Sequence, residues 1–264
     1  MSQGQVWVLL RGLGRDARHW GDFPQRLASA TGSRVHCLDL PGNGARHLQA
    51  SLPTVEAMAD WCHAELARLD LDRPVAVCAL SLGAMVALAW ASRHPGDLAR
   101  AVLVNTSLRP FHPPHWRMRP ASFLGLLRHA LQPGGGDRLE AEILRLTSRR
   151  CGASAEVLAD WCRWRREQPA MLRNVLVQLR AAARYRAPAV APTRRILLLS
   201  GGGDALVDPR CSQTLAQHWQ LPLAVQREAG HDLPLDDPDW VLARIAEWER
   251  GGAVSPAPTP AAIP

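Results

Sequence analysis

The chain has 264 residues, of which 47% are hydrophobic, and 31 basic residues against 24 acidic ones give it a formal net charge of +7. No run approaches the roughly 18 uninterrupted apolar residues that a membrane-spanning helix needs, so the composition predicts no membrane span. One tyrosine and three phenylalanines offer little surface for base stacking, and no nucleic-acid-binding motif accompanies the charge, which argues against nucleic acid as a partner.

The first part of the chain alternates between strand patterns and helix patterns. In chain order we predict a strand at 6–10, a helix at about 22–31, a strand at 34–39, a helix at 53–70, a strand at 74–79, a helix at 82–94 and a strand at 100–105. Such alternation is typical of a mostly parallel, doubly wound sheet covered by helices on both faces, an α/β fold. No basic segment precedes the first strand, which indicates no signal peptide and a cytoplasmic protein.

A helical insertion is predicted between about 108 and 193. Four prolines mark its beginning, and the segments 122–131, 137–151, 153–167 and 169–185 have helical patterns with no strand among them. The sheet then resumes with the predicted strands 196–199 and 223–226. We therefore predict a core of 1–107 and 194–250, an inserted helical cap of 108–193, and a disordered Pro/Ala-rich tail of 251–264.

Ser81 stands where a predicted strand turns into a predicted helix. It lies in Ala79-Leu80-Ser81-Leu82-Gly83, and the small residues two before and two after it suit the tight turn on which hydrolases expose a nucleophilic serine. A serine that caps the helix would produce the same short pattern. Other residues therefore have to decide between a nucleophile and a helix cap.

Two later residues supply the partners that a nucleophilic serine needs. Asp204 lies in a glycine-rich loop directly after the strand 196–199, and His231 follows the strand 223–226. An imidazole takes the serine proton, and a buried carboxylate orients the imidazole. Because the carboxyl ends of parallel strands meet at one edge of a sheet, we predict that Ser81, Asp204 and His231 form a catalytic triad.

The acid of this triad has one rival nearby in the sequence. Asp208 lies four residues after Asp204, in Val207-Asp208-Pro209. Its position also suits a cap for a helix that begins at Pro209. We favour Asp204, because it comes directly after the strand.

With these residues in place, the chain resembles the α/β-hydrolase superfamily over roughly residues 5–250. The shared motifs are the turn at Ser81, the Gly-Gly-Asp loop at Asp204, the Gly-His pair at His231, Asp39-Leu40-Pro41-Gly42-Asn43-Gly44, and Leu9-Leu10-Arg11-Gly12-Leu13-Gly14 with Trp20 downstream. Within the superfamily it is similar to small esterases with a helical cap, such as those that demethylate a pimeloyl-carrier-protein methyl ester in biotin synthesis. The resemblance implies an α/β-hydrolase fold and a serine esterase that uses no cofactor.

The resemblance also implies an oxyanion hole made by the backbone N–H groups of Leu13 and Leu82. Two residues depart from the family pattern. Arg11 stands where the family commonly has a histidine before the glycine of the first loop, and Ala79 stands where it has a glycine. Backbone donors survive such side-chain changes, but the departures leave open a hydrolase-fold protein that binds a ligand without turnover.

A dinucleotide site is the competing interpretation of the first loop. Gly12-Leu13-Gly14-Arg15-Asp16-Ala17 matches G-x-G-x-x-A after a strand, and Asp39 lies where a ribose-binding acid is expected. Such a site needs a helix that begins inside the glycine turn. Because Pro24 belongs in the first turn of a helix, we predict that the helix begins near Asp22, too late to bind a phosphate.

Most of the positive charge falls in the predicted cap. All 31 basic residues of the chain are arginine, and residues 109–195 hold 17 of them against six acidic residues. An arginine-rich composition with solvated helix faces accounts for this without a partner, whereas a localised positive field would steer an acidic one. By analogy with the similar esterases, an acidic acyl carrier protein is the candidate partner. The densest group comprises Arg149, Arg150, Arg163, Arg165 and Arg166.

Aromatic and metal-binding residue types complete the predicted site. Trp116, Trp161 and Trp164 are candidates to line an acyl pocket under the cap, although core packing is the commoner role of a tryptophan. Six cysteines form no C-x-x-C motif, and no H-E-x-x-H is present, so we predict free thiols, no metal and no cofactor. The predicted function is a serine hydrolase that cleaves a carboxylic ester, small or carrier-bound, through an acyl-enzyme. A thioester is the alternative substrate.

Overall fold

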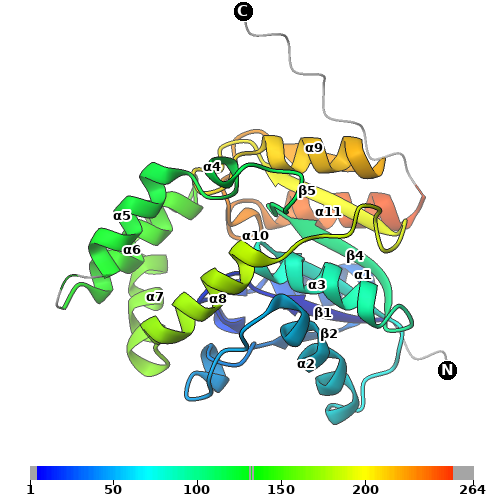
Figure 1. Cartoon of the computed structure of the whole chain (residues 1–264), viewed down its shortest axis with the longest axis horizontal. Coiled ribbons are helices and arrows are strands. Elements are labelled where there is room, and N and C mark those ends of the chain that lie inside the picture. Colours follow the sequence, from blue (N-terminus) through cyan, green and yellow to red (C-terminus); the bar gives the residue numbers. More distant parts are fainter. Residues whose placement is uncertain (1–4, 131, 133, 252–264) are drawn as a thin grey trace, which may run out of the picture.

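A six-stranded sheet forms the centre of the computed structural model, which describes residues 5–130, 132 and 134–251 (Figure 1). Beyond Gly251, the predicted disordered tail lies outside the described residues. The chain runs out to one edge of the sheet and then returns past its first strand, as in a doubly wound fold. In spatial order the strands are β2 (Arg34–Leu38), β1 (Val6–Leu10), β3 (Val75–Leu80), β4 (Leu98–Val104), β5 (Ile196–Gly201) and β6 (Leu223–Gln226), and all neighbours pair in parallel.

Side chains of each strand alternate between two hydrophobic clusters, one on each face of the sheet. Val6, Val8 and Leu10 of β1 belong to one cluster, and Trp7 and Leu9 belong to the other. Such a period of two is a property of extended backbone. The first cluster is completed by α2 (Val55–Arg68), α3 (Leu82–Arg93) and α9 (Arg210–Trp219), and the second by α1 (Phe23–Thr31) and α11 (Pro238–Glu249). The predicted α/β fold is therefore confirmed.

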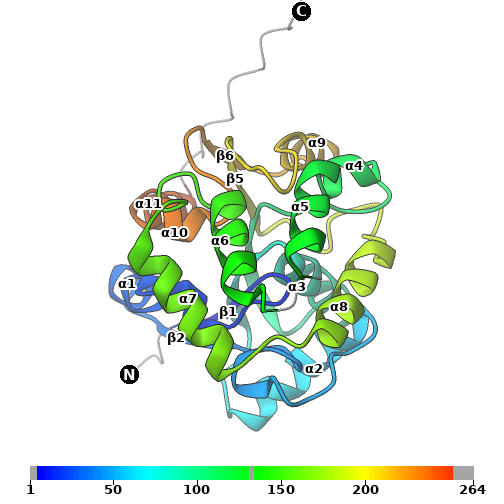
Figure 2. The ribbon, with the colours of Figure 1, turned by 90° about the vertical axis from the view of Figure 1, so that its left-hand side faces the viewer.

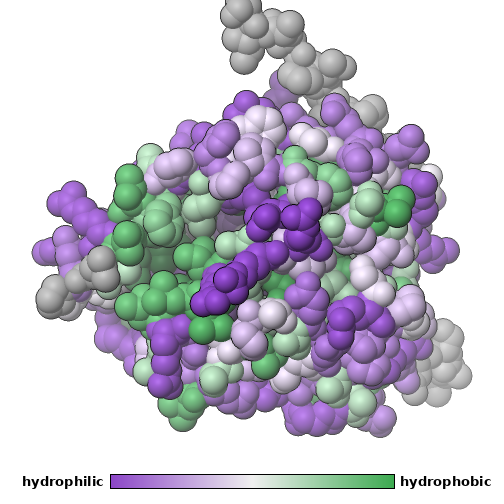
Figure 3. Space-filling view, in the orientation of Figure 1, coloured by the Kyte–Doolittle hydropathy of each residue, from purple (hydrophilic) through white to green (hydrophobic). Residues whose placement is uncertain are grey.

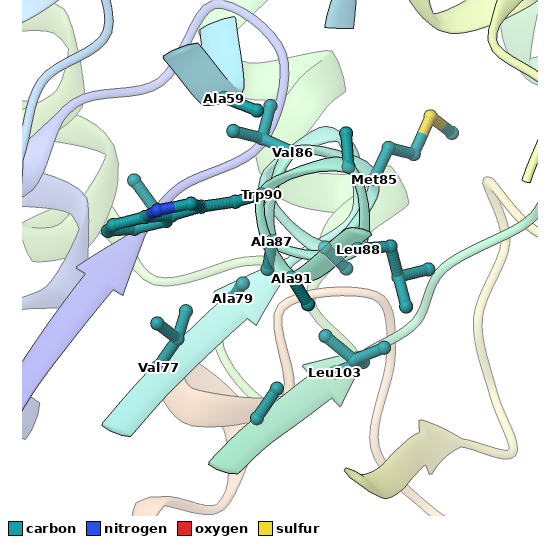
Figure 4. Packing of buried hydrophobic residues seen from close by; sticks show 14 of the residues in the cluster. Ala59, Val77, Ala79, Met85, Val86, Ala87, Leu88, Trp90, Ala91 and Leu103 are labelled. Atoms are coloured by element: carbon teal, nitrogen blue, oxygen red, sulfur yellow. The ribbon is translucent and has the colours of Figure 1, made fainter. Parts of the chain in front are cut away.

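Helix α3 is buried along most of its length because it packs against strands β3 and β4. Every residue from Leu82 to Ala91 is buried, and Figure 4 shows Val77 and Ala79 of β3 and Leu103 of β4 lying beneath the helix. At its first turn the helix touches the end of β1, since a Cβ added to Gly83 would lie 2.4 Å from the Leu10 carbonyl oxygen. The residue that precedes this helix is thereby held at the carboxyl end of the sheet.

Among the described residues, the connection between β4 and β5 forms helices and one isolated parallel bridge between Arg109 and Arg186. The helices lie over the carboxyl ends of the strands (Figure 2). Four of them correspond to predicted ones, and the short α4 was not predicted because a single turn carries no apolar periodicity. They are α4 (Pro114–Arg117), α5 (Pro120–Ala130), α6 (Gly136–Thr147), α7 (Ala155–Glu167) and α8 (Leu172–Arg184). That 108–193 forms a separate cap domain stays a prediction. Within the described residues no helix has the length and apolarity of a membrane span.

Buried polar contacts fasten these helices to the core. Gln178 of α8 is fully buried; its Oε1 accepts a hydrogen bond from the Gly14 N–H at 2.9 Å, and its amide nitrogen donates to Asn43 and Ser51. On α6, the buried Glu140 accepts from Arg15 at 2.6 Å. Burial acts to raise the pKa of Glu140, but the charge and hydrogen bond of Arg15, together with His19 and Arg165, hold that pKa below its usual value. The glycine loop after β1 is therefore in direct contact with α6 and α8.

Candidate active site

Ser81 sits on a strained turn between β3 and α3. Its φ of 56° and ψ of −114° place it in a region that non-glycine residues rarely adopt. Its backbone N–H bonds to the Val104 carbonyl at 2.9 Å, and the Thr106 hydroxyl donates to its carbonyl oxygen at 3.3 Å. The side chain makes no capping hydrogen bond to α3. The helix-cap explanation of this serine therefore has no support. The strained turn is the backbone geometry that a nucleophile elbow requires, and the role of Ser81 as nucleophile stays a prediction.

Gly12, in the loop after β1, lies against this serine. A Cβ added to Gly12 would come within 3.3 Å of the Ser81 Cβ, so a larger residue there would crowd the Ser81 side chain. Leu13 and Leu82 flank this contact in sequence. No hydrogen bond within the described part of the chain uses the N–H of Leu13 or Leu82 as a donor. Both groups have the chemistry of an oxyanion hole, and that role stays a prediction.

His231 and Asp204 meet directly in the structure. The imidazole Nδ1 lies 2.7 Å from the Asp204 Oδ2, and the two residues are 5% and 3% exposed. Because a carboxylate only accepts hydrogen bonds, this contact places a proton on Nδ1 and leaves Nε2 of the neutral ring free to take another. The second carboxylate oxygen accepts from the N–H groups of Leu206 and Val207 at 2.8 and 2.9 Å, which fixes its orientation.

Asp208, the sequence rival for the acid, has other partners. Its carboxylate accepts from the Arg210 side chain at 2.7 and 2.9 Å and from the Arg210 N–H at 3.0 Å. The side-chain hydrogen bonds from Arg210 hold the pKa of Asp208 below its usual value. Asp208 therefore accepts from the first N–H of α9 but lies one residue before its N-cap, Pro209, while Asp204 is the carboxylate that contacts His231.

Asn105 and Asp236 fasten the loops of the site, and sequence reasoning missed both. Asn105, just after β4, donates to the carbonyl oxygens of Gly230 and His231 at 3.1 and 2.8 Å and accepts from the Gly201 N–H at 2.8 Å. Asp236 accepts from the Gly230 N–H at 2.6 Å and from the Arg149 N–H at 2.9 Å. The sequence does carry a signal for Asn105, because it is a polar residue directly after the apolar strand β4. No pattern in the sequence marks Asp236.

The predicted tryptophans have identifiable packing partners. Trp161 lies under the Arg15 guanidinium, whose central carbon is 4.3 Å from the ring centroid, and both Trp161 and Trp164 make edge contacts with His19. Trp116 stacks under Arg210 at 4.1 Å. These contacts hold α7 and α4 against the core. That the three rings also line an acyl pocket stays a prediction.

The five predicted partner-binding arginines differ in how they are engaged. Arg165 pairs with the buried Glu140, and Arg150 pairs with Asp237. The more exposed Arg163 and Arg166 pair with Asp160 and Asp137. The Arg149 guanidinium has no acidic partner among the described residues, and the methylenes of its side chain lie close to Gly203 and Gly230. Only the exposed pairs could release a guanidinium to another molecule at little cost.

The insertion also exposes apolar side chains on α5 and α8. These side chains are Phe123, Leu124 and Leu127 of α5 and Met171, Leu172 and Leu176 at α8. Figure 3 shows hydrophobic side chains gathered over α5 and the lower part of α8, next to strongly hydrophilic ones farther along α8. Apolar and hydrophilic surfaces therefore adjoin on this face of the insertion.

One cluster of metal-ligand residue types occurs in the described chain, and it lies away from Ser81. His63, His94 and Asp97 come together at the far end of α3, where the two imidazoles stack with centroids 3.9 Å apart. His63 bonds to Asp97 at 2.7 Å and His94 bonds to Asp60 at 2.9 Å. These hydrogen bonds already account for both histidines.

Comparison with known proteins adds three findings. A model of the family described as "Alpha/beta hydrolase family" matches residues 7–244. A protein of Aromatoleum aromaticum named pimeloyl-[acyl-carrier protein] methyl ester esterase is 31% identical over 256 residues, 92% of this chain and 98% of its own, and one of the same name from Neisseria meningitidis is 28% identical over 84% and 85%. A thermophilic esterase from Thermogutta terrifontis, 24% identical, superimposes with a TM-score of 0.74 over 94% of this chain and 90% of that chain.

Proposed function

Since the chain belongs to the α/β hydrolase family, we propose that it is a carboxylic ester hydrolase in which Ser81 carries the acyl group. The observation that supports this most is the combination of a serine on a strained turn with a buried histidine bonded to an acid, all at the carboxyl end of one sheet. Those are the groups that acyl transfer requires.

The chemistry follows from the roles of these groups. The Nε2 atom of His231 takes the proton of the Ser81 hydroxyl as its oxygen attacks the ester carbonyl, and the N–H groups of Leu13 and Leu82 stabilise the resulting oxyanion. The imidazolium then gives the proton to the leaving alcohol, and an acyl-enzyme remains. Water, deprotonated by the same imidazole, releases the acid and restores Ser81. Asp204 keeps the imidazole in the required tautomer throughout.

For the substrate we propose an ester whose acyl chain is carried on an acidic carrier protein. The two relatives are named for a methyl ester of this kind. The insertion carries both exposed apolar side chains and exposed arginines, which suits a partner that presents an acyl chain within an acidic protein. A cytoplasmic location goes with this proposal.

A fluorophosphonate probe tests the proposed chemistry. We expect covalent labelling of wild type and none of Ser81→Ala, with mass spectrometry placing the adduct on Ser81. Failure of wild type to react with several such probes and to hydrolyse any nitrophenyl ester would overturn the proposal and favour a ligand-binding protein. Parallel assays with a carrier-bound methyl ester and the matching carrier-bound thioester identify the bond that is cleaved.

A further inference from the structure

A buried ion pair joins the loop after β1 to the loop that carries His231. The Arg11 Nη1 donates to the Asp232 Oδ1 at 3.0 Å, and Nη2 donates to Oδ2 at still closer range. The two side chains are only 4% and 3% exposed. Parallel donation from one guanidinium to both oxygens of a carboxylate is a strong and directional arrangement.

Each partner is the immediate neighbour of a residue of the proposed machinery. Arg11 precedes Gly12, which lies against Ser81, while Asp232 directly follows His231. The Arg11 guanidinium also lies 4.7 Å from the centroid of the Trp20 ring, and the Asp232 N–H bonds to the Thr147 carbonyl at 2.7 Å. The pair therefore fixes the distance between the loop of the proposed oxyanion hole and the loop of the base.

Charge is balanced within this pair. A buried carboxylate left alone beside His231 would favour the imidazolium, and a buried guanidinium left alone would disfavour it. Among the described residues, Asp204 is bonded to the ring of this histidine, and the Asp236 carboxylate accepts from N–H groups of the same region. Arg149 approaches the loop through the methylenes of its stem.

We propose that Arg11 and Asp232 act together as positioning residues for His231, an inference that rests on the proposed ester hydrolysis. The pair holds the histidine loop against the loop of the oxyanion hole and adds no net charge beside the base. It also explains the departure at Arg11: an arginine can replace the histidine common in similar esterases because Asp232 supplies its counter-charge.

Three single variants separate position from charge. In Arg11→Met and Asp232→Asn we expect kcat for a small nitrophenyl ester to fall by about 10- to 100-fold with little change in KM, since small displacements of catalytic groups cost this much. The acidic limb of the pH–rate profile should move to higher pH in Arg11→Met and to lower pH in Asp232→Asn. Arg11→Lys keeps the charge without the fork, so it should lose kcat and keep the wild-type profile.

The double variant Arg11→Met/Asp232→Asn provides the decisive control, and it removes the unpaired charge that could unfold either single variant. Its pH profile should return to that of wild type while kcat stays low. Folded variants that retain wild-type kcat and profile, or single variants whose profiles move in the same direction, would overturn the inference.

An NMR titration of the His231 imidazole keeps this test separate from the proposed function. The titration curve should move in the same two opposite directions in the two single variants, whether or not an ester is turned over. An inactive wild-type protein would defeat the proposed hydrolysis alone. An active wild type whose variants show no opposed movement would defeat the role of the pair alone.

Discussion

Two histidine–aspartate pairs of equal length lie at opposite ends of the sheet. At the carboxyl end His231 contacts Asp204 at 2.7 Å, and at the amino end His63 contacts Asp97 at 2.7 Å. The first pair is buried beside a strained serine, whereas the His63 side chain is 37% exposed and stacks on His94. A histidine bonded to a carboxylate is therefore not by itself a catalytic signature. Burial and a strained serine at the same end of the sheet are what support the proposed role of the first pair.

The largest expected effect separates these two ends. Ser81→Ala or His231→Ala should lower kcat by about 10³-fold or more, and the double variant should be little worse, because the residues act in one step. His63→Ala should leave kcat within about twofold, since it only loses a surface contact. Steady-state assays with a nitrophenyl ester provide the comparison, and additive losses at Ser81 and His231 would contradict a shared mechanism.

Replacing the aspartates of the two pairs, Asp204 and Asp97, tests the same comparison. Asp204→Asn should cost about 10³-fold in kcat, because an asparagine that donates to Nδ1 selects the wrong tautomer. Asp97→Asn should cost stability but not kcat in the folded fraction. Asp208→Asn is the matched variant within the site, and if it lowers kcat more than Asp204→Asn does, the assignment of the acid is wrong.

A further prediction concerns how the free energy of unfolding depends on pH. Burial lowers the pKa of His19 to about 4, while the unfolded imidazole titrates near 6.5. Between about pH 6.5 and pH 4 the unfolded state therefore binds a proton that the folded state does not bind. The free energy of unfolding is not reduced by this group above pH 6.5, and it falls as the pH is lowered toward 4. Chemical denaturation should show the free energy of unfolding falling by about 1.4 kcal/mol per pH unit from this group. His19→Gln should reduce that slope, and an unchanged slope would contradict the burial argument.

Adding a methyl group should change stability in opposite directions at Gly83, near the carboxyl end of the sheet, and at Gly96, near its amino end. Gly83→Ala places a Cβ 2.4 Å from the Leu10 carbonyl oxygen and should destabilise the fold by about 1–3 kcal/mol. Gly96→Ala meets nothing within 4 Å and should be neutral or stabilising by up to about 1 kcal/mol. Urea denaturation of both variants gives the comparison, and equal losses would mean that the end of β1 can move away from α3.

The smallest expected effect concerns the partner. Arg163→Gln/Arg166→Gln should raise KM for a carrier-bound ester by a few fold at low salt without changing a small neutral ester, because exposed charges chiefly alter encounter. Arg34→Gln/Arg93→Gln removes the same charge from exposed ion pairs elsewhere and is the control. Added salt should erase the difference. Equal values of KM for wild type and both variants at low salt would leave the basic insertion without a role in recognition.

The strands, the helices and the proposed triad could be predicted from the sequence because each is marked by a short local pattern. Apolar runs bounded by glycine and proline located β1, β3 and β5, and Asp204 could be favoured over Asp208 by its place directly after β5. The pairing of Arg11 with Asp232 joins residues 221 positions apart. Nothing periodic or local marks such a contact, and the same holds for the bonds of Asp236 and for the acids that engage the arginines of the insertion.

The fully buried amide of Gln178 restricts how the insertion can move. Moving α8 away from the core would leave the Gly14 N–H and the side chains of Asn43 and Ser51 without their hydrogen-bond partners. Each of these groups that water does not reach would cost about 1–3 kcal/mol. Helix α8 is therefore the fixed edge of the insertion. Any displacement of the insertion that preserves these hydrogen bonds has to leave α8 in place against the core.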